Sequence, residues 1–333
     1  MSIARPVTVA VDAVGGDFAP GCILEGVSLA LAANPTVRVI LTGPAGVIEP
    51  FAASSMGRVE PVVTTQTIEM GEHPAGAVRA KQDSSIVVGA RLVRDGRADA
   101  FFSAGNTGAC MAAATLVMGR IKSVSRPAIA TVLPTVGVPC VLLDVGANAD
   151  CKPENLLQFA EMGEAYASVV LGVEHPRVAL LNIGEEPAKG SILAQEAHAL
   201  LAEKVAAFIG NIEGRDVMSG AADVIVTDGF TGNVALKLLE GTSNALFSEL
   251  KGAMTQSMMT KLAAAVLKPS LTRLKDRLDP EMTGGAPLLG VDGVCIIGHG
   301  ASGALAVENA IKVAVQAVDG DLTGRIRQAV AAN

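Results

Sequence analysis

Six short apolar segments of this chain each run into a Gly-rich turn with polar side chains, and this recurrence constrains the fold more than any other feature. The turns occupy residues 13–17, 104–108, 145–148, 183–186, 229–233 and 299–303. Short runs of Val, Ile, Leu and Ala are typical of parallel strands that are buried on both faces. The carboxyl ends of such strands share one edge of a sheet, where α/β proteins bind their ligands. The sequence therefore predicts an α/β protein with a composite site along that edge.

Composition favours the same fold class. Half of the 333 residues are hydrophobic and only 3% are aromatic, so small aliphatic side chains must fill the core. We expect a three-layer α/β/α sandwich with a mostly parallel sheet. Because the chain contains neither a low-complexity linker nor an internal repeat, we expect residues 1–333 to form a single domain, with a helical excursion at about 234–285.

Local sequence patterns predict the individual elements. Strands are expected at residues 7–12, 37–42, 98–103, 128–133, 141–144, 177–182, 222–228 and 294–298. The strands at 128–133 and 141–144 flank a PTVG turn, which indicates an antiparallel pair. A helix is expected from Pro153 to a stop at Gly172, because Pro suits the first helical position and Gly suits the C-terminal end. An apolar stripe predicts a second helix at 191–210.

Several classes of function are disfavoured. The net charge of −7 lacks the basic excess that nucleic-acid binding requires. The five Cys are scattered and form no C-x-x-C pair, which indicates reduced thiols in a cytosol. The first residues lead directly into a strand, so we expect no signal peptide, and no apolar run is long enough to span a bilayer. Paired His or Cys spacing is absent, so no metal site is expected.

The turns favour an anion as the ligand. Gly lets the backbone approach a ligand closely, helix N-termini favour negative charge, and Asn, Ser and Thr add neutral donors. The chain contains no P-loop sequence. The GHGASG run at 298–303 matches the dinucleotide pattern, but the second strand with an acid at its end is missing. We therefore interpret this run as an anion or carbonyl nest.

Six stretches of the chain resemble the bacterial phosphate acyltransferase family. They are VAVDAVGGDFAP at 9–20, SAGNTGA at 103–109, LDVGAN at 143–148, NIGEE at 182–186 with Lys189 and Gly190, DGFTGN at 228–233, and GGAPLLG at 284–290. All occur in order, and the resemblance covers residues 7–310. One departure, Val14 where the family is expected to have Met, is a conservative apolar exchange.

The resemblance implies both a fold and an activity. The fold would be similar to that of the isocitrate and isopropylmalate dehydrogenases and of phosphotransacetylase. The activity would be transfer of a fatty acyl group from acyl–acyl carrier protein to inorganic phosphate, which gives acyl phosphate for phospholipid synthesis. The resemblance also implies a homodimer without metal or organic cofactor. It implies a cytoplasmic protein in peripheral contact with the inner face of the cell membrane, where the downstream membrane glycerol-3-phosphate acyltransferase is a candidate partner.

The residues at the turns suit this chemistry. Phosphate is already a nucleophile near neutral pH, so the enzyme has to position it, reduce its charge repulsion and stabilise the oxyanion. Lys189 and Asn233 match positions that are treated as catalytic in the family. Lys189 would hold phosphate or the oxyanion, and Asn233, expected at the start of a helix, would donate to the oxyanion. Without the resemblance, Lys189 is interpreted as a solvated lysine and Asn233 as a helix cap.

The other candidates are acids, neutral donors and one histidine. Asp12 is a candidate proton acceptor, and His299 is either the proton donor to the leaving thiolate or a structural histidine. Because carboxylates repel phosphate, we expect the acids to orient cations or backbone N–H groups. The predicted phosphate or substrate contacts are Gly15, Gly16, Asp17, Ser103, Asn106, Thr107, Asp144, Asn148, Glu185, Asp228, Thr231, Gly232 and Ser302.

Residues 251–278 form a basic amphipathic segment. Its charged residues are Lys251, Lys261, Lys268, Arg273, Lys275, Asp276 and Arg277. Apolar residues recur every four positions, and Pro269 is expected to break the helical pattern. Such a segment suits an anionic membrane surface or an acidic carrier protein. The alternative is a helix that packs in the core or at a dimer interface.

Three other functions stay open at this point. A phosphotransacetylase-like transferase would use acyl-CoA as its donor. A hydride-transfer enzyme would share the fold and bind nicotinamide, and a non-catalytic membrane scaffold would keep the fold without the reaction. Turnover with each donor, nicotinamide titration and the effect of Lys189→Ala on phosphate-dependent thiol release distinguish these functions.

Overall fold

The structure of the chain, a computed structural model, describes residues 5–278 and 284–332 and is built on an eleven-stranded sheet. The strands are β1 (Thr8–Asp12), β2 (Arg38–Gly43), β3 (Val59–Val63), β4 (Ala100–Ser103), β5 (Ala128–Leu133), β6 (Cys140–Leu143), β7 (Val178–Asn182), β8 (Phe208–Glu213), β9 (Val224–Val226), β10 (Ala286–Leu289) and β11 (Val294–Ile297). They lie in the order β3-β2-β1-β4-β11-β10-β5-β6-β9-β7-β8, so two late strands occupy the middle of the sheet.

The sheet is mostly parallel, as the sequence predicts. β3, β2, β1, β4 and β11 run in one direction, and β6, β9, β7 and β8 form a second parallel group. The pairs β11–β10, β10–β5 and β5–β6 between these groups are antiparallel. The antiparallel pairing of β5 with β6, which the PTVG turn indicates, is therefore confirmed.

Helices cover both faces of the sheet, which confirms the three-layer α/β/α sandwich. They are α1 (Gly21–Ala33), α2 (Ala45–Ser54), α3 (Pro74–Ala80), α4 (Ser85–Arg94), α5 (Thr107–Ala113), α6 (Pro153–Val170), α7 (Ile192–Lys204), α8 (Gly229–Met254), α9 (Met258–Leu278), α10 (Ala304–Asp319) and α11 (Leu322–Ala331). Successive strand residues point to opposite faces. Val9 and Val11 belong to the core cluster on the face covered by α1, α6 and α10, whereas Ala10 belongs to the cluster on the face covered by α3, α4 and α5.

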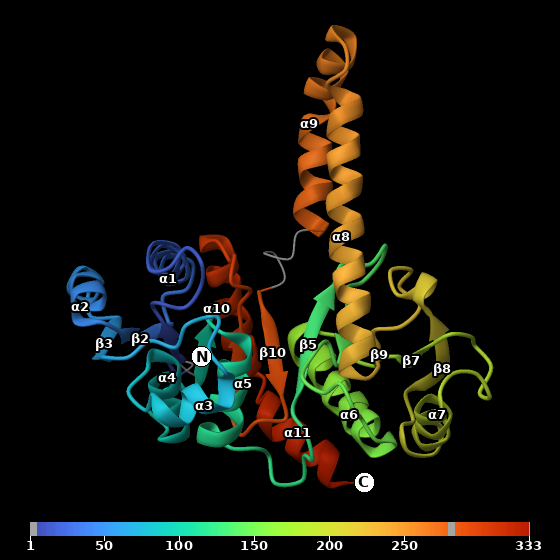
Figure 1. Cartoon of the computed structure of the whole chain (residues 1–333), viewed down its shortest axis with the longest axis horizontal. Coiled ribbons are helices and arrows are strands. Elements are labelled where there is room, and N and C mark those ends of the chain that lie inside the picture. The colour runs from blue at the N-terminus through green and yellow to red at the C-terminus, as the bar shows by residue number, and fades with distance from the viewer. Residues whose placement is uncertain (1–4, 279–283, 333) are drawn as a thin grey trace.

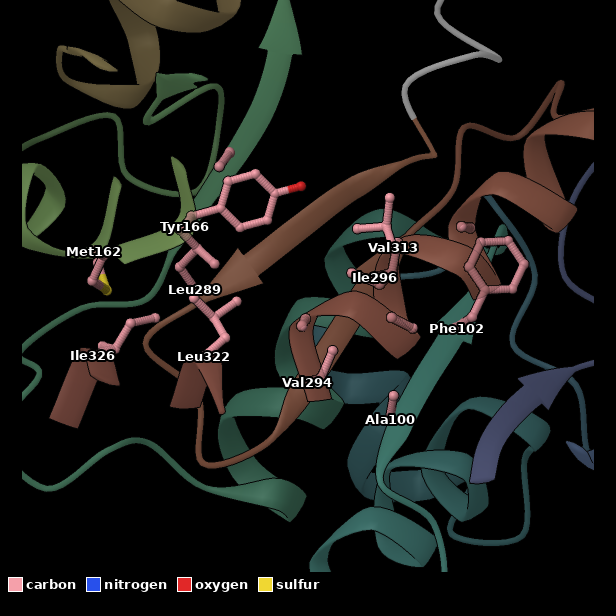
Figure 2. Packing of buried hydrophobic residues seen from close by; sticks show 14 of the residues in the cluster. Ala100, Phe102, Met162, Tyr166, Leu289, Val294, Ile296, Val313, Leu322 and Ile326 are labelled. Atoms are coloured by element: carbon pink, nitrogen blue, oxygen red, sulfur yellow. The ribbon is translucent and has the colours of Figure 1, made fainter. Parts of the chain in front are cut away.

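Aliphatic side chains fill most of the core, and the aromatic residues buried in it are Phe101, Phe102, Phe159 and Tyr166. Figure 2 shows Phe102 of β4 near Val313 of α10, and Tyr166 of α6 near Leu289 of β10. Phe102 and Tyr166 are both fully buried. Together these contacts join α6, α10 and α11 to the middle of the sheet (Figure 2).

Helix α6 has the bounds that its sequence predicts. It begins at Pro153, and Glu154 lies in its first turn, where the positive end of the helix dipole favours an acid. Gly172 follows the helix with a φ of 71°, a conformation that Gly adopts without strain. The expected stop at Gly172 therefore coincides with the end of the helix.

Other bounds differ from the prediction. The helix expected at 191–210 ends at Lys204, because Val205 takes an extended conformation and the chain then forms strand β8 beside β7. Strands β3 and β10 also have no predicted counterpart. β3 is a partly exposed edge strand that contains Pro61, and β10 is only four residues long, so neither shows the apolar run typical of a buried strand.

Helices α8 and α9 form a hairpin that projects from the body of the protein (Figure 1). Of the 26 residues in α8, the buried ones are Gly229 and Gly232. Pro269 lies inside α9, so the expected break at Pro269 is wrong. The predicted cations Arg273, Lys275 and Arg277, and the acid Asp276, have side chains outside the described part of the structure. Within residues 5–278 and 284–332, no helix is long and apolar enough to cross a membrane.

Candidate active site

The six Gly-rich turns fall into two sets, because the sheet reverses its direction at the middle. β1, β4 and β11 carry one set, and β6, β9 and β7 carry the other. Three antiparallel pairs separate the two groups, and an odd number of reversals leaves the groups opposed. The prediction that all six turns share one edge of a parallel sheet is therefore wrong.

Asp12, the last residue of β1, holds the first set of turns together. Its Oδ2 accepts a hydrogen bond from Ser103 Oγ at 2.7 Å, and its Oδ1 accepts one from the Val14 N–H at 3.1 Å. Ser103 Oγ in turn accepts the Gly105 N–H at 3.0 Å. Burial raises the pKa of Asp12, and the hydrogen bonds from Ser103 and Val14 oppose that rise. The Asp12 side chain thus connects the turns that follow β1 and β4.

Gly15 and Gly16 let the first turn pass close to its neighbours. A Cβ on Gly15 would lie 2.5 Å from Asp12 Oδ2, so only Gly fits there. Gly16 has a φ of 107° and faces the carbonyl oxygen of Gly300, which also accepts the Asp17 N–H at 2.7 Å. The side chain of Asp17 is exposed. The turns after β1 and β11 are therefore in direct contact.

Asn106 is buried, and both the oxygen and the nitrogen of its side-chain amide form hydrogen bonds within the protein. Its Oδ1 caps α5 by accepting the Ala109 N–H at 2.9 Å. Its Nδ2 donates to the carbonyl oxygens of Glu69, Met70 and Glu72 at 3.2, 2.9 and 3.2 Å. The amide therefore holds a segment from a distant part of the chain against the β4 turn. Sequence reasoning missed this segment, because no local pattern connects it to Asn106.

The turn after β11 contains His299 and Ser302. His299 is exposed, and its Nδ1 accepts the Ala301 N–H at 3.2 Å. The neutral imidazole then carries its proton on Nε2. Ser302 is buried and donates its N–H to the His299 carbonyl at 2.9 Å. Thr107, at the start of α5 in the neighbouring turn, is exposed.

In the second set, Asp144 follows β6 and is 0% exposed. Its Oδ1 accepts the N–H groups of Ile129, Gly146 and Ala147 at 3.1, 3.1 and 3.0 Å. Its Oδ2 accepts the N–H and the Nδ2 of Asn148 at 2.7 and 2.8 Å. Burial raises the pKa of Asp144, and these hydrogen bonds oppose that rise. The turn after β6 is thus folded around one carboxylate.

Helix α8 begins above this turn. Asp228 is its N-cap and accepts the N–H and Oγ1 of Thr231 at 2.9 and 2.7 Å. Because this cap sets the start of α8 at Gly229, Asn233 is the fifth helical residue, and the expected helix start at Asn233 is wrong. Asn233 is exposed, and its Cγ lies 3.7 Å from the position that a Cβ on Gly146 would take. Its amide therefore stands beside the β6 turn.

Lys189 lies in the loop between β7 and α7. The helix is capped by Ser191, whose Oγ accepts the Ala194 N–H. The Lys189 N–H donates to the Glu186 carbonyl at 3.0 Å, and Asn182 Nδ2 donates to the Lys189 carbonyl at 3.1 Å. These bonds fix the backbone of the loop.

Lys189 and Asn233 both carry polar groups that are available to a ligand. Both side chains are exposed, and neither hydrogen-bonds to another described residue. Glu185 is also exposed. Among the residues that the structure describes, no three His, Cys, Asp or Glu side chains come together as a metal site. The exposed groups can hold an anion and donate to an oxyanion.

Asn211 and His198 lie behind the β7 turn, and neither could be predicted as part of the site from the sequence. Asn211 Nδ2 donates to the Glu186 carbonyl at 3.0 Å, and Asn211 Oδ1 lies 2.9 Å from His198 Nδ1. His198 packs edge-on against Phe208, with 5.2 Å between the ring centroids. Asn211 and Phe208 lie on β8, a strand without a predicted counterpart, so no local signal could connect them with the loop.

The architecture and its turns place the chain in a known class of α/β proteins. It is similar to the EutD phosphotransacetylase from Staphylococcus aureus, with a TM-score of 0.60, 16% identity and 94% of each chain covered. It is also similar to a branched-chain phosphotransacylase from Enterococcus faecalis V583, with a TM-score of 0.58, 16% identity, and 94% of this chain and 99% of that chain covered. The fold is therefore the phosphotransacetylase fold.

Sequence relatives define the family within that class. Residues 7–325 match a family described as fatty acid synthesis protein. The phosphate acyltransferase of Heliobacterium modesticaldum is 49% identical over 96% of both chains. The phosphate acyltransferase of a Geobacillus species, strain WCH70, is 48% identical over 98% of this chain and 99% of its own. The chain belongs to the phosphate acyltransferase family and is an acyltransferase.

Proposed function

We propose that the acyl donor is acyl–acyl carrier protein, so that the enzyme transfers a fatty acyl group from this carrier to inorganic phosphate and releases acyl phosphate for phospholipid synthesis. One observation carries the proposal. The chain is similar over its full length to phosphate acyltransferases, and it matches the family described as fatty acid synthesis protein. A fatty acyl thioester is the donor that fits both descriptions.

The reaction needs an anion site and an oxyanion site. A phosphate oxygen attacks the thioester carbonyl carbon, a C–O bond forms, and the carbonyl oxygen becomes an oxyanion. The oxyanion then collapses, the C–S bond breaks, and the thiolate leaves and takes a proton. Lys189 lowers the repulsion between phosphate and the developing charge, and the Asn233 amide donates to the oxyanion. Both groups are exposed for these contacts.

The twist of the sheet supports a single site formed by both sets of turns. Neighbouring strands rotate by about 20–25°. Six steps separate β1 from β9 in the strand order. The accumulated rotation is about 120–150°, and it cancels most of the reversal between the two groups. We therefore propose that the carboxyl ends of both groups face a shared site, with Lys189 and Asn233 across from the Gly16 and His299 turns.

Other residues of the turns have further roles. His299 is exposed in the turn after β11 and, in its imidazolium form, supplies the proton that the leaving thiolate takes, which leaves the imidazole neutral. Asp12 and Asn106 act as supports, since both side chains are occupied inside the protein. Asp17, Thr107 and Glu185 are exposed in these turns, and we assign them to the rim by which the donor thioester would enter.

The experiment is mass-spectrometric detection of acyl phosphate with acyl–acyl carrier protein or acyl-CoA as the donor, with and without phosphate. We expect phosphate-dependent product from the carrier-protein donor. Lys189→Ala and Asn233→Ala should each lower kcat by about 100- to 1,000-fold. Lys204→Ala, which removes an exposed lysine from the end of α7, is the matched control and should leave kcat unchanged.

Three results would contradict the proposal. Product from acyl-CoA alone would favour a phosphotransacetylase-like donor. Absence of any phosphate-dependent thiol release by the folded wild type would favour a scaffold. Full activity of Lys189→Ala would exclude Lys189 from the reaction while leaving the activity itself in place.

We also propose that the enzyme is a homodimer in peripheral contact with the cytoplasmic face of the cell membrane, near the membrane acyltransferase that would use its product. Exposed apolar side chains on the first half of α8, including Phe230, Val234 and Leu238, supply a surface for a second subunit. Exposed Met258, Met259, Leu262 and Val266 on α9 supply the surface for lipid. Sedimentation equilibrium tests the dimer.

A further inference from the structure

Asp144 is a buried carboxylate that the proposed chemistry does not use directly. It is 0% exposed, and both of its oxygens are occupied by N–H groups of the protein. It therefore cannot touch phosphate or a thioester. One of its hydrogen-bond donors, Gly146, nevertheless lies beside the residue that we place at the oxyanion, so we look for the function of Asp144 in the backbone that it holds.

The donors to Asp144 come from two parts of the chain. Ile129 on β5 contributes one N–H, and the turn at Gly146, Ala147 and Asn148 contributes the others. Asn148 adds its side-chain amide, which also donates to the Pro127 carbonyl at 2.8 Å. A carboxylate is the side chain that accepts so many N–H groups, whereas an asparagine would direct its own NH₂ at some of them. The surrounding N–H donors therefore select both the negative charge and the shape of the Asp144 side chain.

The first turn of α8 rests on the same carboxylate. A Cβ on Gly229 would lie 2.7 Å from Asp144 Oδ2, and a Cβ on Gly232 would overlap the Asp144 carbonyl oxygen. The Gly229 N–H donates to the Asn148 carbonyl at 2.7 Å. The backbone of α8 thus contacts the Asp144 turn without an intervening side chain. A movement of that turn must move the start of the helix.

Asn233 is positioned by this contact. It follows Gly232 directly, and its Cγ lies 3.7 Å from the Cβ position of Gly146, whose N–H is held by Asp144. We propose that Asp144 is a positioning residue for the reaction, which acts by fixing the first turn of α8 and hence the place of the Asn233 amide. The proposal rests on the function proposed above, in which Asn233 donates to the oxyanion.

The test compares kcat and KM for the wild type, Asp144→Asn, Asn233→Ala and the double variant, with acyl–acyl carrier protein and phosphate. We expect Asp144→Asn to lower kcat by about 10- to 100-fold, with KM for both substrates changed less than about twofold. In the Asn233→Ala background the same substitution should lower kcat by less than about twofold, because residues that act as one unit are not additive.

The matched control is Asp223→Asn. Asp223 is a buried carboxylate at the amino end of β9 and is hydrogen-bonded to Arg177, so its loss weakens the same half of the protein away from the turns. Its kcat should equal that of the wild type. If Asp144→Asn does not fold, Asn148→Ala removes one donor from Asp144 Oδ2 and should show a smaller kcat loss of about threefold to tenfold with the same dependence on Asn233.

The outcomes separate the two proposals. A wild-type kcat for the folded Asp144→Asn variant, or full additivity with Asn233→Ala, would overturn the positioning role. An inactive wild type would instead contradict the proposed function. An unaffected Asn233→Ala variant would remove Asn233 from the oxyanion site, and the proposed action of Asp144 through Asn233 would be overturned with it.

Discussion

Asp12 and Asp144 have the same structural role in the two sets of turns. Each carboxylate stands at the end of a buried strand and accepts N–H groups of the turn that follows. A buried carboxylate that lost these donors would cost several kcal/mol. The protein therefore cannot fold without giving both turns their shape. Asn233 stands beside the turn that Asp144 holds, whereas the Lys189 loop is held by the Glu186 carbonyl and the Asn182 side chain.

Acid lowers stability through Asp223. Burial raises the pKa of Asp223, but hydrogen bonds from the Arg177 side chain and N–H outweigh burial and hold that pKa below its usual value. Because the folded pKa is depressed, the pair stabilises the fold above the unfolded pKa of about 3.9, and this stabilisation disappears as the pH falls through the folded pKa.

We expect Asp223→Asn to lower the free energy of unfolding at pH 7 by about 1.5–3 kcal/mol. The difference from the wild type should shrink as the pH is lowered toward about 3. Urea denaturation across this range measures it. A difference that stays constant with pH would show that the Asp223 charge does not contribute to stability.

Residues beside Gly at strand ends could be predicted from the sequence as site candidates, because α/β proteins bind their ligands at the carboxyl ends of parallel strands. What each side chain does there could not be predicted. Asn106 looks like a free donor in the sequence, yet its amide is occupied by Met70 and its neighbours, which lie far from it in the chain. The role of the Asn106 amide can be assigned only when the position of the distant segment around Met70 is known.

At the scale of elements, the start of α8 combines a cap, two tightly packed glycines and the exposed Asn233. The local sequence indicates a helix here but not its first residue, because Asp228, Thr231 and Asn233 all suit an N-terminus. Tertiary contact decides the matter, since Gly229 and Gly232 are the residues that fit against the Asp144 turn. The local sequence also misleads at Pro269, where a helix break is expected but α9 continues.

The α8–α9 hairpin should determine membrane binding. Leu262 and Val266 are 66% and 81% exposed, and burying such side chains in lipid contributes about 1.5–3 kcal/mol each. Replacing both with Ser should lower the fraction of protein that sediments with phosphatidylglycerol vesicles by about tenfold or more. Met56→Ser removes an 87% exposed apolar side chain elsewhere and is the control.

The salt dependence of this binding is informative as well. Lys251, Lys261 and Lys268 are exposed on the hairpin, so added salt should weaken binding to anionic vesicles. Unchanged sedimentation of the double Ser variant would exclude lipid contact through this part of α9. The apolar stripe would then belong to a protein interface.

At the scale of the whole molecule, the sheet is continuous from β3 to β8, although its two parallel groups are opposed. Helices α6, α10 and α11 pack across its middle (Figure 2). The parallel groups could be predicted from the alternation of strands and helices. The reversal between them could not, because it depends on the pairing of β10 with β5, and the short β10 has no predicted counterpart.

We expect the chain to unfold as one cooperative unit. Tyr166 is the one tyrosine of a chain without tryptophan and is fully buried, so its fluorescence reports on the core around α6. In urea, Tyr166 fluorescence and far-UV circular dichroism should give the same midpoint. Two separate midpoints would indicate that the parallel groups are independent domains.

Two deletion variants test whether the chain unfolds as one cooperative unit. A variant that ends at residue 278 lacks β10, β11, α10 and α11 and should show no cooperative transition. Removal of residues 246–266 with a short Gly linker should leave the transition intact, because this part of the hairpin is largely exposed. A folded truncation at 278 would contradict the central role of β10 and β11.

The central position of β10 and β11 also affects how the protein is made. The ribosome synthesises these two strands after every other strand of the sheet, and until then β4 and β5 present unpaired edges to the cytosol. Open strand edges pair readily with other chains. A nascent chain of this enzyme is therefore most prone to aggregation while the α8–α9 hairpin is being translated, a period in which a chaperone would be most effective.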